Sequence, residues 1–205
     1  MRGWMHVAIC LVEFRGLAAV FFIADEMLKA ADIKLLAHKN SGSAYISLLF
    51  SGDVSALNQA EAAGKKAADK MIRFTKNNAP LSYDYGLGKN FYSIVINRPR
   101  IDIKNIFFDD MHQEDLNIEN KAVGFIDTKG VVSAAAAADA MAKSSNVDIY
   151  RYQRMGSGEL SVVVCGKIED VIQAVDAGII EGKKYGKVQN SSIIAKPSME
   201  MYRMF

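Results

Sequence analysis

The sequence contains little cysteine, proline or histidine, and its charges nearly balance. Its 205 residues include 2 cysteines, 3 prolines and 3 histidines, and the formal net charge is +2. Two cysteines, Cys10 and Cys165, cannot form a disulfide framework, so a disulfide-stapled scaffold is excluded. With 50% hydrophobic residues the chain is neither disordered nor collagen-like. The small net charge argues against a protein that coats nucleic acid or an anionic membrane.

Long hydrophobic runs are also missing. The longest apolar stretches, 17–24 and 131–138, are far shorter than the ~18 residues that a membrane span needs. Near the N-terminus an apolar run faintly resembles a signal peptide, but Glu13 and Arg15 interrupt it and no cleavage site follows. The sequence therefore predicts a soluble protein of the cytoplasm.

Motifs for catalysis or metal binding are not found. There is no phosphate-binding Gly-x-x-x-x-Gly-Lys loop, and no dinucleotide-binding Gly-x-Gly-x-x-Gly follows a strand. His6, His38 and His112 are too far apart for metal-ligand spacing, and neither half of the chain offers a nucleophile with a base. The acidic stretch 109–115 allows either a divalent-ion site or a solvated linker, and the linker is favoured. We expect no catalytic residues and no metal site.

An internal repeat dominates the sequence. Residues 8–17 align with 122–131, and the same offset of roughly 114 continues without a gap through Gly64 and Gly178. About fifteen of roughly 66 aligned positions are identical, and most others are conservative. The end of each copy matches at an offset of roughly 98, so the first copy carries an insertion at about 75–90. The chain is therefore a tandem duplication.

The order of predicted elements is the same in both copies, β-α-β-β-α-β. In the second copy we expect strands at 122–127, 147–154, 160–165 and 188–195, with helices at 131–145 and 168–184. This order predicts an α+β fold of two tandem ferredoxin-like βαββαβ domains, with the helices on one face of an antiparallel sheet. The expected domains are 1–99 and 122–198, separated by a linker at 100–121 and followed by a tail at 199–205.

A glycine–serine turn stands at the same place in each copy. Ser41-Gly42-Ser43-Ala44 and Met155-Gly156-Ser157-Gly158 both fall between the second and third predicted strands. A single such turn would only indicate a position that needs glycine for positive φ. Its retention in two divergent copies favours a shared role, such as close approach of backbones around an axis.

At this point the motifs resemble a known family. The segments 122–130, 138–143, 154–158, 176–178 and 194–197, in this order and spacing, are similar to the bacterial microcompartment (BMC) shell domain. The resemblance covers 122–197 closely and 7–99 more loosely. Two copies in one chain resemble the tandem-domain shell proteins with unpermuted strand order.

The resemblance implies a homotrimer whose six domains mimic a hexagonal tile, with the tiles packed edge to edge into a shell. It implies that the hairpins line a central pore; these residues are Ser41, Gly42, Ser43, Ala44, Met155, Gly156, Ser157 and Gly158. It places the tile-edge contacts at Lys29, Lys143, Arg98 and Lys196. Serine hydroxyls and loop amides at a pore favour small polar or anionic metabolites.

The implied partners are the chain itself, other microcompartment shell proteins, enclosed enzymes and small metabolites, with no nucleic acid and no membrane. Some tandem shell proteins hold an iron–sulfur cluster through a pore-loop cysteine; neither hairpin has one, so we expect no cofactor. Lys196 stands where an arginine is usual, which weakens or alters that edge contact. The alternative is a trimeric ferredoxin-like regulator that binds a small ligand between subunits; an enzyme or electron carrier is weaker still.

Overall fold

The computed structural model describes residues 7–78, 91–101, 104–107, 120–198 and 201, and the chain divides into two compact units. The first unit is Met1–Pro99 and the second is Arg100–Phe205. Each unit is described by itself below.

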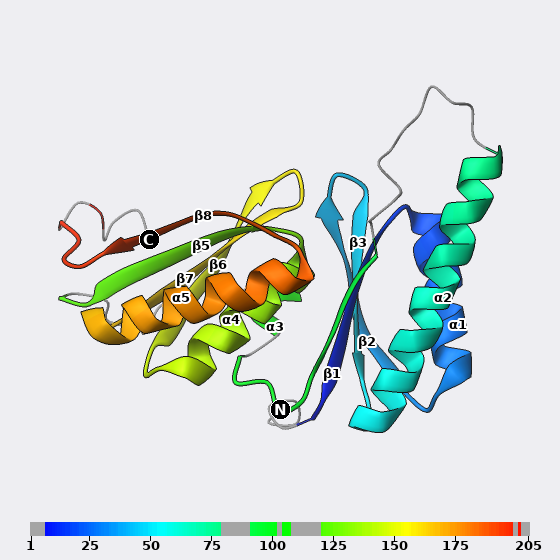
Figure 1. The fold of residues 1–205 in the computed structure, drawn as a ribbon, viewed down its shortest axis with the longest axis horizontal. Coiled ribbons are helices and arrows are strands. Elements are labelled where there is room, and N and C mark those ends of the chain that lie inside the picture. The colour runs from blue at the N-terminus through cyan, green and yellow to red at the C-terminus, as the bar shows by residue number, and fades with distance from the viewer. Residues whose placement is uncertain (1–6, 79–90, 102–103, 108–119, 199–200, 202–205) are drawn as a thin grey trace. The chain divides into compact units, whose positions relative to one another are not determined.

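The first unit is a four-stranded antiparallel sheet with two helices on one face (Figure 1). Its elements are, in chain order, β1 (Ile9–Arg15), α1 (Leu17–Ala30), β2 (Lys34–Gly42), β3 (Tyr45–Ser51), α2 (Val54–Asn78) and β4 (Tyr92–Ile96). The strand order is β2-β3-β1-β4, so β1 and β3 are central and β2 and β4 are edge strands.

The second unit repeats this arrangement. Its elements are α3 (Lys104–Phe107), β5 (Ala122–Lys129), α4 (Val131–Ser144), β6 (Asp148–Gly156), β7 (Glu159–Gly166), α5 (Ile168–Tyr185) and β8 (Lys187–Ile194). The strand order β6-β7-β5-β8 matches the first unit, and α4 and α5 cover one face (Figure 1). The predicted α+β class, with two tandem ferredoxin-like βαββαβ domains, is confirmed, and the predicted elements differ from those observed by a few residues at most.

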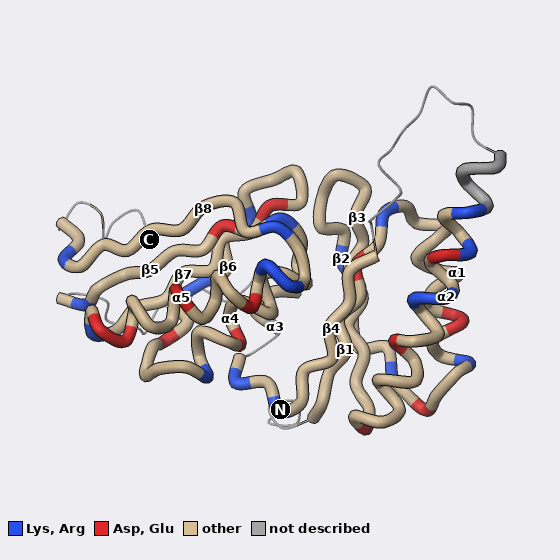
Figure 2. The backbone as a smooth tube through the Cα atoms, in the orientation of Figure 1, with Lys and Arg blue, Asp and Glu red and all other residues tan. Residues whose placement is uncertain are grey.

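In each unit a glycine follows the strand that precedes the first long helix. Gly16 and Gly130 have φ values of 98° and 99°, in the region that glycine adopts without steric cost. The first helix starts at the next residue in both units. In α4 the run Ala134–Ala138 is fully buried, because small side chains let the helix approach its neighbours closely. By contrast α2 is amphipathic, and Figure 2 shows basic and acidic residues interspersed along it.

The two units differ in their connections. α2 has 25 residues and α5 has 18, so the first unit's helix is extended by seven residues into the predicted insertion, while 79–90 lie outside the described residues. In the predicted linker, Ile101, Ile106 and Phe107 are buried within the second unit, whereas 108–119, including the acidic stretch 109–115, are not described. Of the predicted tail 199–205, only Met201 is described. No helix in the described part of the chain is long and apolar enough to span a bilayer.

A glycine–methionine contact joins the two helices of each unit. A Cβ atom placed on Gly64 of α2 would lie 2.8 Å from the Met27 Sδ of α1. The same repeat positions meet in the second unit, where a Cβ on Gly178 would lie 2.7 Å from Met141 Cγ and 2.6 Å from Ile126 Cδ1. Both methionines are fully buried. The glycines kept in the repeat therefore permit close packing of the helix pair.

Gly178→Ala is expected to destabilise the protein. Overpacking a filled core costs about 1–3 kcal/mol, which exceeds the roughly 1 kcal/mol that alanine gains over glycine in a helix. Urea unfolding at fixed protein concentration measures the change. Asp176→Ala, at an exposed position of the same helix, is the control and should change stability by less than about 0.5 kcal/mol. A more stable Gly178→Ala protein would contradict the close contact.

Candidate functional site

The two candidate pore hairpins have the same backbone conformation. Gly42 and Gly156 both have φ of 89°, and the next residues, Ser43 and Ser157, both have φ of 50°. The last loop position also has positive φ in each unit, 63° at Ala44 and 79° at Gly158. Two consecutive loop residues with positive φ are the pattern of the tight turn that suits twisted strands. The repeat has therefore preserved a conformation as well as a sequence.

Each hairpin is tied to the start of the first helix of its unit. The Gly16 N–H donates to the Ala44 carbonyl oxygen at 2.9 Å, and the Gly130 N–H donates to the Gly158 carbonyl oxygen at 2.8 Å. Because these glycines lie between the first strand and the first helix, the hydrogen bond ties the loop to the junction of those two elements. The backbone alone therefore positions the hairpin tip, and its side chains take no part in this bond.

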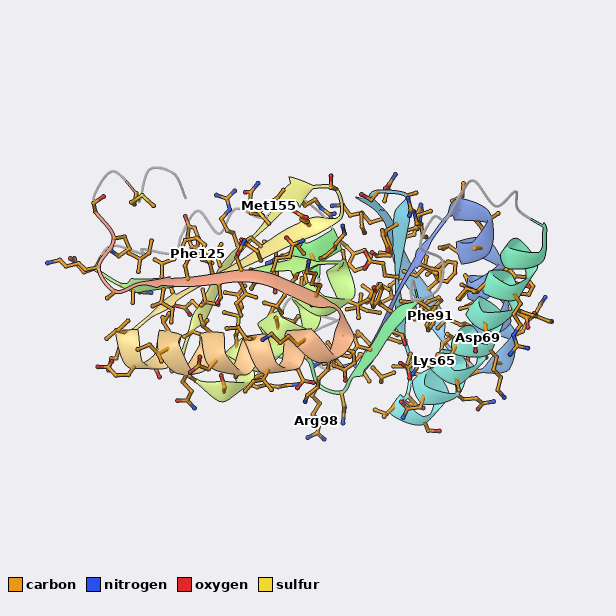
Figure 3. All side chains as sticks on the ribbon, turned by 45° about the horizontal axis from the view of Figure 1, so that its top comes forward. Lys65, Asp69, Phe91, Arg98, Phe125 and Met155 are labelled. Carbon is orange, nitrogen blue, oxygen red and sulfur yellow. The ribbon has the colours of Figure 1, made fainter. Side chains whose placement is uncertain are left out.

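The hairpin residues differ in what they expose. Ser43, Ala44, Gly156 and Ser157 are exposed, and Figure 3 places Met155 on the β6–β7 hairpin, where it is also exposed. Gly158 is buried, and its carbonyl oxygen faces Gly130. The tip of the β2–β3 hairpin carries no charged residue (Figure 2). The two serines are the polar side chains that the tips present.

Ser41 is placed differently from the other predicted pore residues. It is only 7% exposed, and its hydroxyl lies 2.5 Å from the Ser47 hydroxyl on β3. Ser47 in turn donates to a Glu13 carboxylate oxygen at 3.0 Å. Burial, together with the negative charge of Glu13, raises the pKa of Tyr92. The sequence reasoning missed this buried polar chain, although a glutamate within an otherwise apolar strand was a visible signal.

The basic residues near the second hairpin are engaged within their unit. Arg154 Nη2 donates to the Ile106 carbonyl oxygen at 3.0 Å. Arg151 donates to the Gln153 side chain on the same strand. These contacts direct Arg154 toward the segment before β5 rather than toward the hairpin tip.

The predicted edge lysines pair with aspartates one turn earlier on their own helices. Lys29 contacts Asp25, whose hydrogen bond raises the pKa of Lys29, and Lys143 contacts Asp139. The two members of the first pair are more than half exposed, whereas Asp139 is nearly buried. Each lysine lies in the last turn of its helix, where a cation interacts favourably with the helix dipole.

The other two predicted edge residues share one local arrangement. Arg98 and Lys196 are exposed, and each precedes a buried proline, Pro99 or Pro197. Figure 3 shows the Arg98 side chain extending away from the ribbon. Arg98 has φ of 51°, an uncommon conformation for a residue other than glycine.

The cysteines lie in the cores of the sheets. Burial raises the pKa of Cys10 on β1 to about 12 and that of Cys165 on β7 to about 11. Both are protonated free thiols at neutral pH. Within the described ranges, no group of three histidine, cysteine, aspartate or glutamate residues is placed to hold a metal ion.

Comparison with known proteins places the chain in a family. The model of the BMC domain matches twice, at residues 8–79 and 122–197. The chain is 30% identical over 203 residues to the bacterial microcompartment shell protein PduT of Citrobacter freundii, covering 97% of each chain. It is 26% identical over 197 residues to the carboxysome assembly protein CcmO of Synechocystis sp., covering 92% of this chain but only 61% of that relative.

A solved structure has the same fold. The crystal structure of a microcompartment protein from Desulfitobacterium hafniense DCB matches with a TM-score of 0.66 and 25% identity, covering 96% of this chain and 98% of that one. The two domain matches span most of the chain. The protein therefore belongs to the BMC-domain family of bacterial microcompartment shell proteins, as the resemblance of its motifs indicated, and within that family it is a tandem-domain member.

Exchanging the last loop residue between the two hairpins should change the stability of the two units in opposite directions. An L-residue in the left-handed region costs roughly 1 kcal/mol relative to glycine. Ala44→Gly should therefore stabilise the first unit by up to about 1 kcal/mol, and Gly158→Ala should destabilise the second by a similar amount. Urea unfolding of both variants tests this. Equal shifts of the same sign would contradict the shared conformation.

Proposed function

We propose that the protein is a structural tile of a bacterial microcompartment shell, a homotrimer in which six BMC domains surround a central pore. The observation that carries this proposal is the matched pair of hairpins, which have the same turn conformation and the same backbone tie in both units. Because both domains carry the same hairpin in the same conformation, they can alternate around the central axis of a trimer. The shell role of relatives such as PduT supports the same conclusion.

The proposed pore is lined by Ser43 and Ser157, with the backbone of Gly42 and Gly156 beside them. Serine hydroxyls both donate and accept hydrogen bonds, so a ring of six can replace part of the hydration of a small polar solute. Backbone amides at the turn add partial positive charge, which favours anionic metabolites. Ser41 has a supporting role in this proposal, because its hydroxyl is bonded inside the unit to Ser47.

The proposed tile edges are formed by Lys29, Lys143, Arg98 and Lys196. A lysine or arginine reaches several ångströms beyond the backbone and can donate to carbonyl oxygens of a neighbouring tile. Asp25 and Asp139 orient the two helix lysines without burying them, so each retains donors for a neighbour. The proposal is for a structural role rather than catalysis, with other shell proteins as edge partners and a location in the shell of a compartment in the cytoplasm.

Replacing Lys29 and Lys143 with alanine should prevent extended sheets while sparing the trimer. Three chains of 22.5 kDa give a native mass of about 68 kDa, which should be unchanged because the substitutions remove donors only at the tile edge. Native mass spectrometry and electron microscopy of negatively stained protein measure the two properties.

Lys184→Ala is the matched control for the edge variant. Lys184 is also exposed, lies in the last turn of a helix and pairs with Glu181 on that helix at 2.5 Å. It should form sheets as the parent does. Intact sheets in the double edge variant would remove the edge assignment, and a monomeric parent protein would remove the trimer and the pore together.

Charge placed at the two loop serines should alter permeation selectively. Aspartate and asparagine both tolerate positive φ and are similar in size, so Ser43→Asp/Ser157→Asp can be compared with Ser43→Asn/Ser157→Asn. The aspartate pair adds six negative charges per trimer and should slow entry of an anionic substrate by at least tenfold relative to the asparagine pair. Turnover by an enzyme enclosed in assembled shells measures entry. A neutral substrate should enter equally with both, and equal anion entry would contradict the pore.

A further inference from the structure

An apolar groove lies open on the first unit, between α1 and the edge strand β2. It has a volume of about 310 Å³ and is lined mainly by apolar side chains, with Asp25 at its side. Leu17 and Phe21 are 61% and 68% exposed, and Leu28 and Leu35 are also exposed. Large apolar side chains gathered in one exposed patch mark a surface that another segment covers.

The corresponding surface of the second unit is not open. Val131 and Ala135, which align with Leu17 and Phe21, are 3% and 0% exposed. The described residues of the segment that follows Pro99, 100–101 and 104–107, are bonded to α4 and β6 of this unit at two points. The Arg100 N–H donates to Asp139 Oδ1 at 2.8 Å on α4, and Arg154 of β6 donates to the Ile106 carbonyl oxygen at 3.0 Å.

The segment after Pro197 repeats the pattern of the segment after Pro99. Residues 100–107 read Arg-Ile-Asp-Ile-Lys-Asn-Ile-Phe, and residues 198–205 read Ser-Met-Glu-Met-Tyr-Arg-Met-Phe. Apolar residues fall at the second, fourth, seventh and eighth positions of both, and an acidic residue falls at the third. The preceding prolines are both buried, and the Met201 N–H donates to the Ser198 carbonyl oxygen at 3.0 Å.

We propose that residues 198–205 of one chain dock in the α1–β2 groove of a second copy, as residues 100–107 dock on α4 and β6 of their own unit. This inference rests on the proposed trimer. The first unit of each chain offers an open groove, and each chain has one segment 198–205. If each chain docks on the next in this way, the contact is head-to-tail, and such contacts close into a ring when the rotation between copies closes, as it does in the proposed trimer.

The chemistry of the groove suits this occupant. Asp25 corresponds to Asp139 and offers its carboxylate to the Ser198 N–H, as Asp139 does to Arg100. Asn40 corresponds to Arg154, and its amide Nδ2 can donate to the carbonyl oxygen at 204 while Oδ1 accepts from Gly42. Phe21 and Leu28 make this groove more irregular than its alanine-rich counterpart, and flexible methionines fill irregular apolar space well.

A photo-crosslinker at position 205 of the full chain tests the docking. Phe205→benzoylphenylalanine should, after irradiation, give species of two and three chain masses on a denaturing gel. Peptide mass spectrometry should place the crosslinks in α1 or β2, within residues 17–42. Native mass measured on the same sample reports whether the trimer exists.

The outcomes separate this inference from the proposed function. A trimer whose crosslinks stay within one chain, or reach residues outside the groove, overturns the docking and leaves the trimeric tile intact. A trimer that gives no crosslinks also overturns the docking and leaves the trimeric tile intact. A protein of single-chain native mass overturns both.

Substitutions in the segment provide a second measurement with a matched control. Met204→Glu/Phe205→Glu should raise the protein concentration at which the trimer half dissociates by at least tenfold, because it places two charges in an apolar groove. The control Met204→Ile installs the residue found at the matching position, Ile106, and should leave dissociation within about twofold. Phe21→Asp in the groove should match the glutamate pair. Unchanged dissociation in these variants would overturn the docking.

Discussion

One backbone hydrogen bond in each unit underlies both the hairpin and the groove. The N–H of the glycine between the first strand and first helix donates to the last loop residue of the hairpin, from Gly16 to Ala44 and from Gly130 to Gly158. The donor glycine has positive φ in both units, a conformation that glycine adopts without steric cost. The bond therefore fixes the hairpin tip relative to the helix start, and with it the edge strand that forms one wall of the groove.

The two copies have kept this constraint while their surfaces have diverged. Backbone angles of the hairpins agree within a few degrees at the first two positions, because the bond and the tight turn depend on the main chain. The side chains of the first helix take no part in this bond, and α4 is alanine-rich where α1 carries Phe21 and Leu28. The two domains of the tandem repeat therefore have hairpins of the same conformation but differ in the surface beside the first helix, which, among the described residues, is an open groove only in the first unit.

The fold could be predicted well from the sequence because the tandem repeat shows each pattern twice. Gly64 and Gly178 align, and so do the methionines they pack against, so the periodicity of each helix could be checked twice. Prediction from the sequence failed for residues whose role depends on their tertiary surroundings. Ser41 looks like a loop residue by its neighbours, yet its hydroxyl is bonded to Ser47 beside buried Glu13, a contact set by strand pairing rather than by spacing. The segment 100–107 was predicted to be part of the linker 100–121, but Ile101 and Phe107 are buried, which only tertiary packing reveals.

That segment also explains why the second unit of the fold begins before the second copy of the repeat. By sequence, residues after Pro99 lie between copies; by structure, they belong to the second unit and are bonded to Asp139 and Arg154. The strand before Pro99 belongs to the first domain and the residues after it belong to the second, so this buried proline lies at the domain boundary. Pro197 stands at the same point of the second copy, and in the proposed docking the next domain is that of another chain. The open groove on α1 is the surface that this docking would cover, so in the proposed trimer it gives each chain a physical reason to associate with the next.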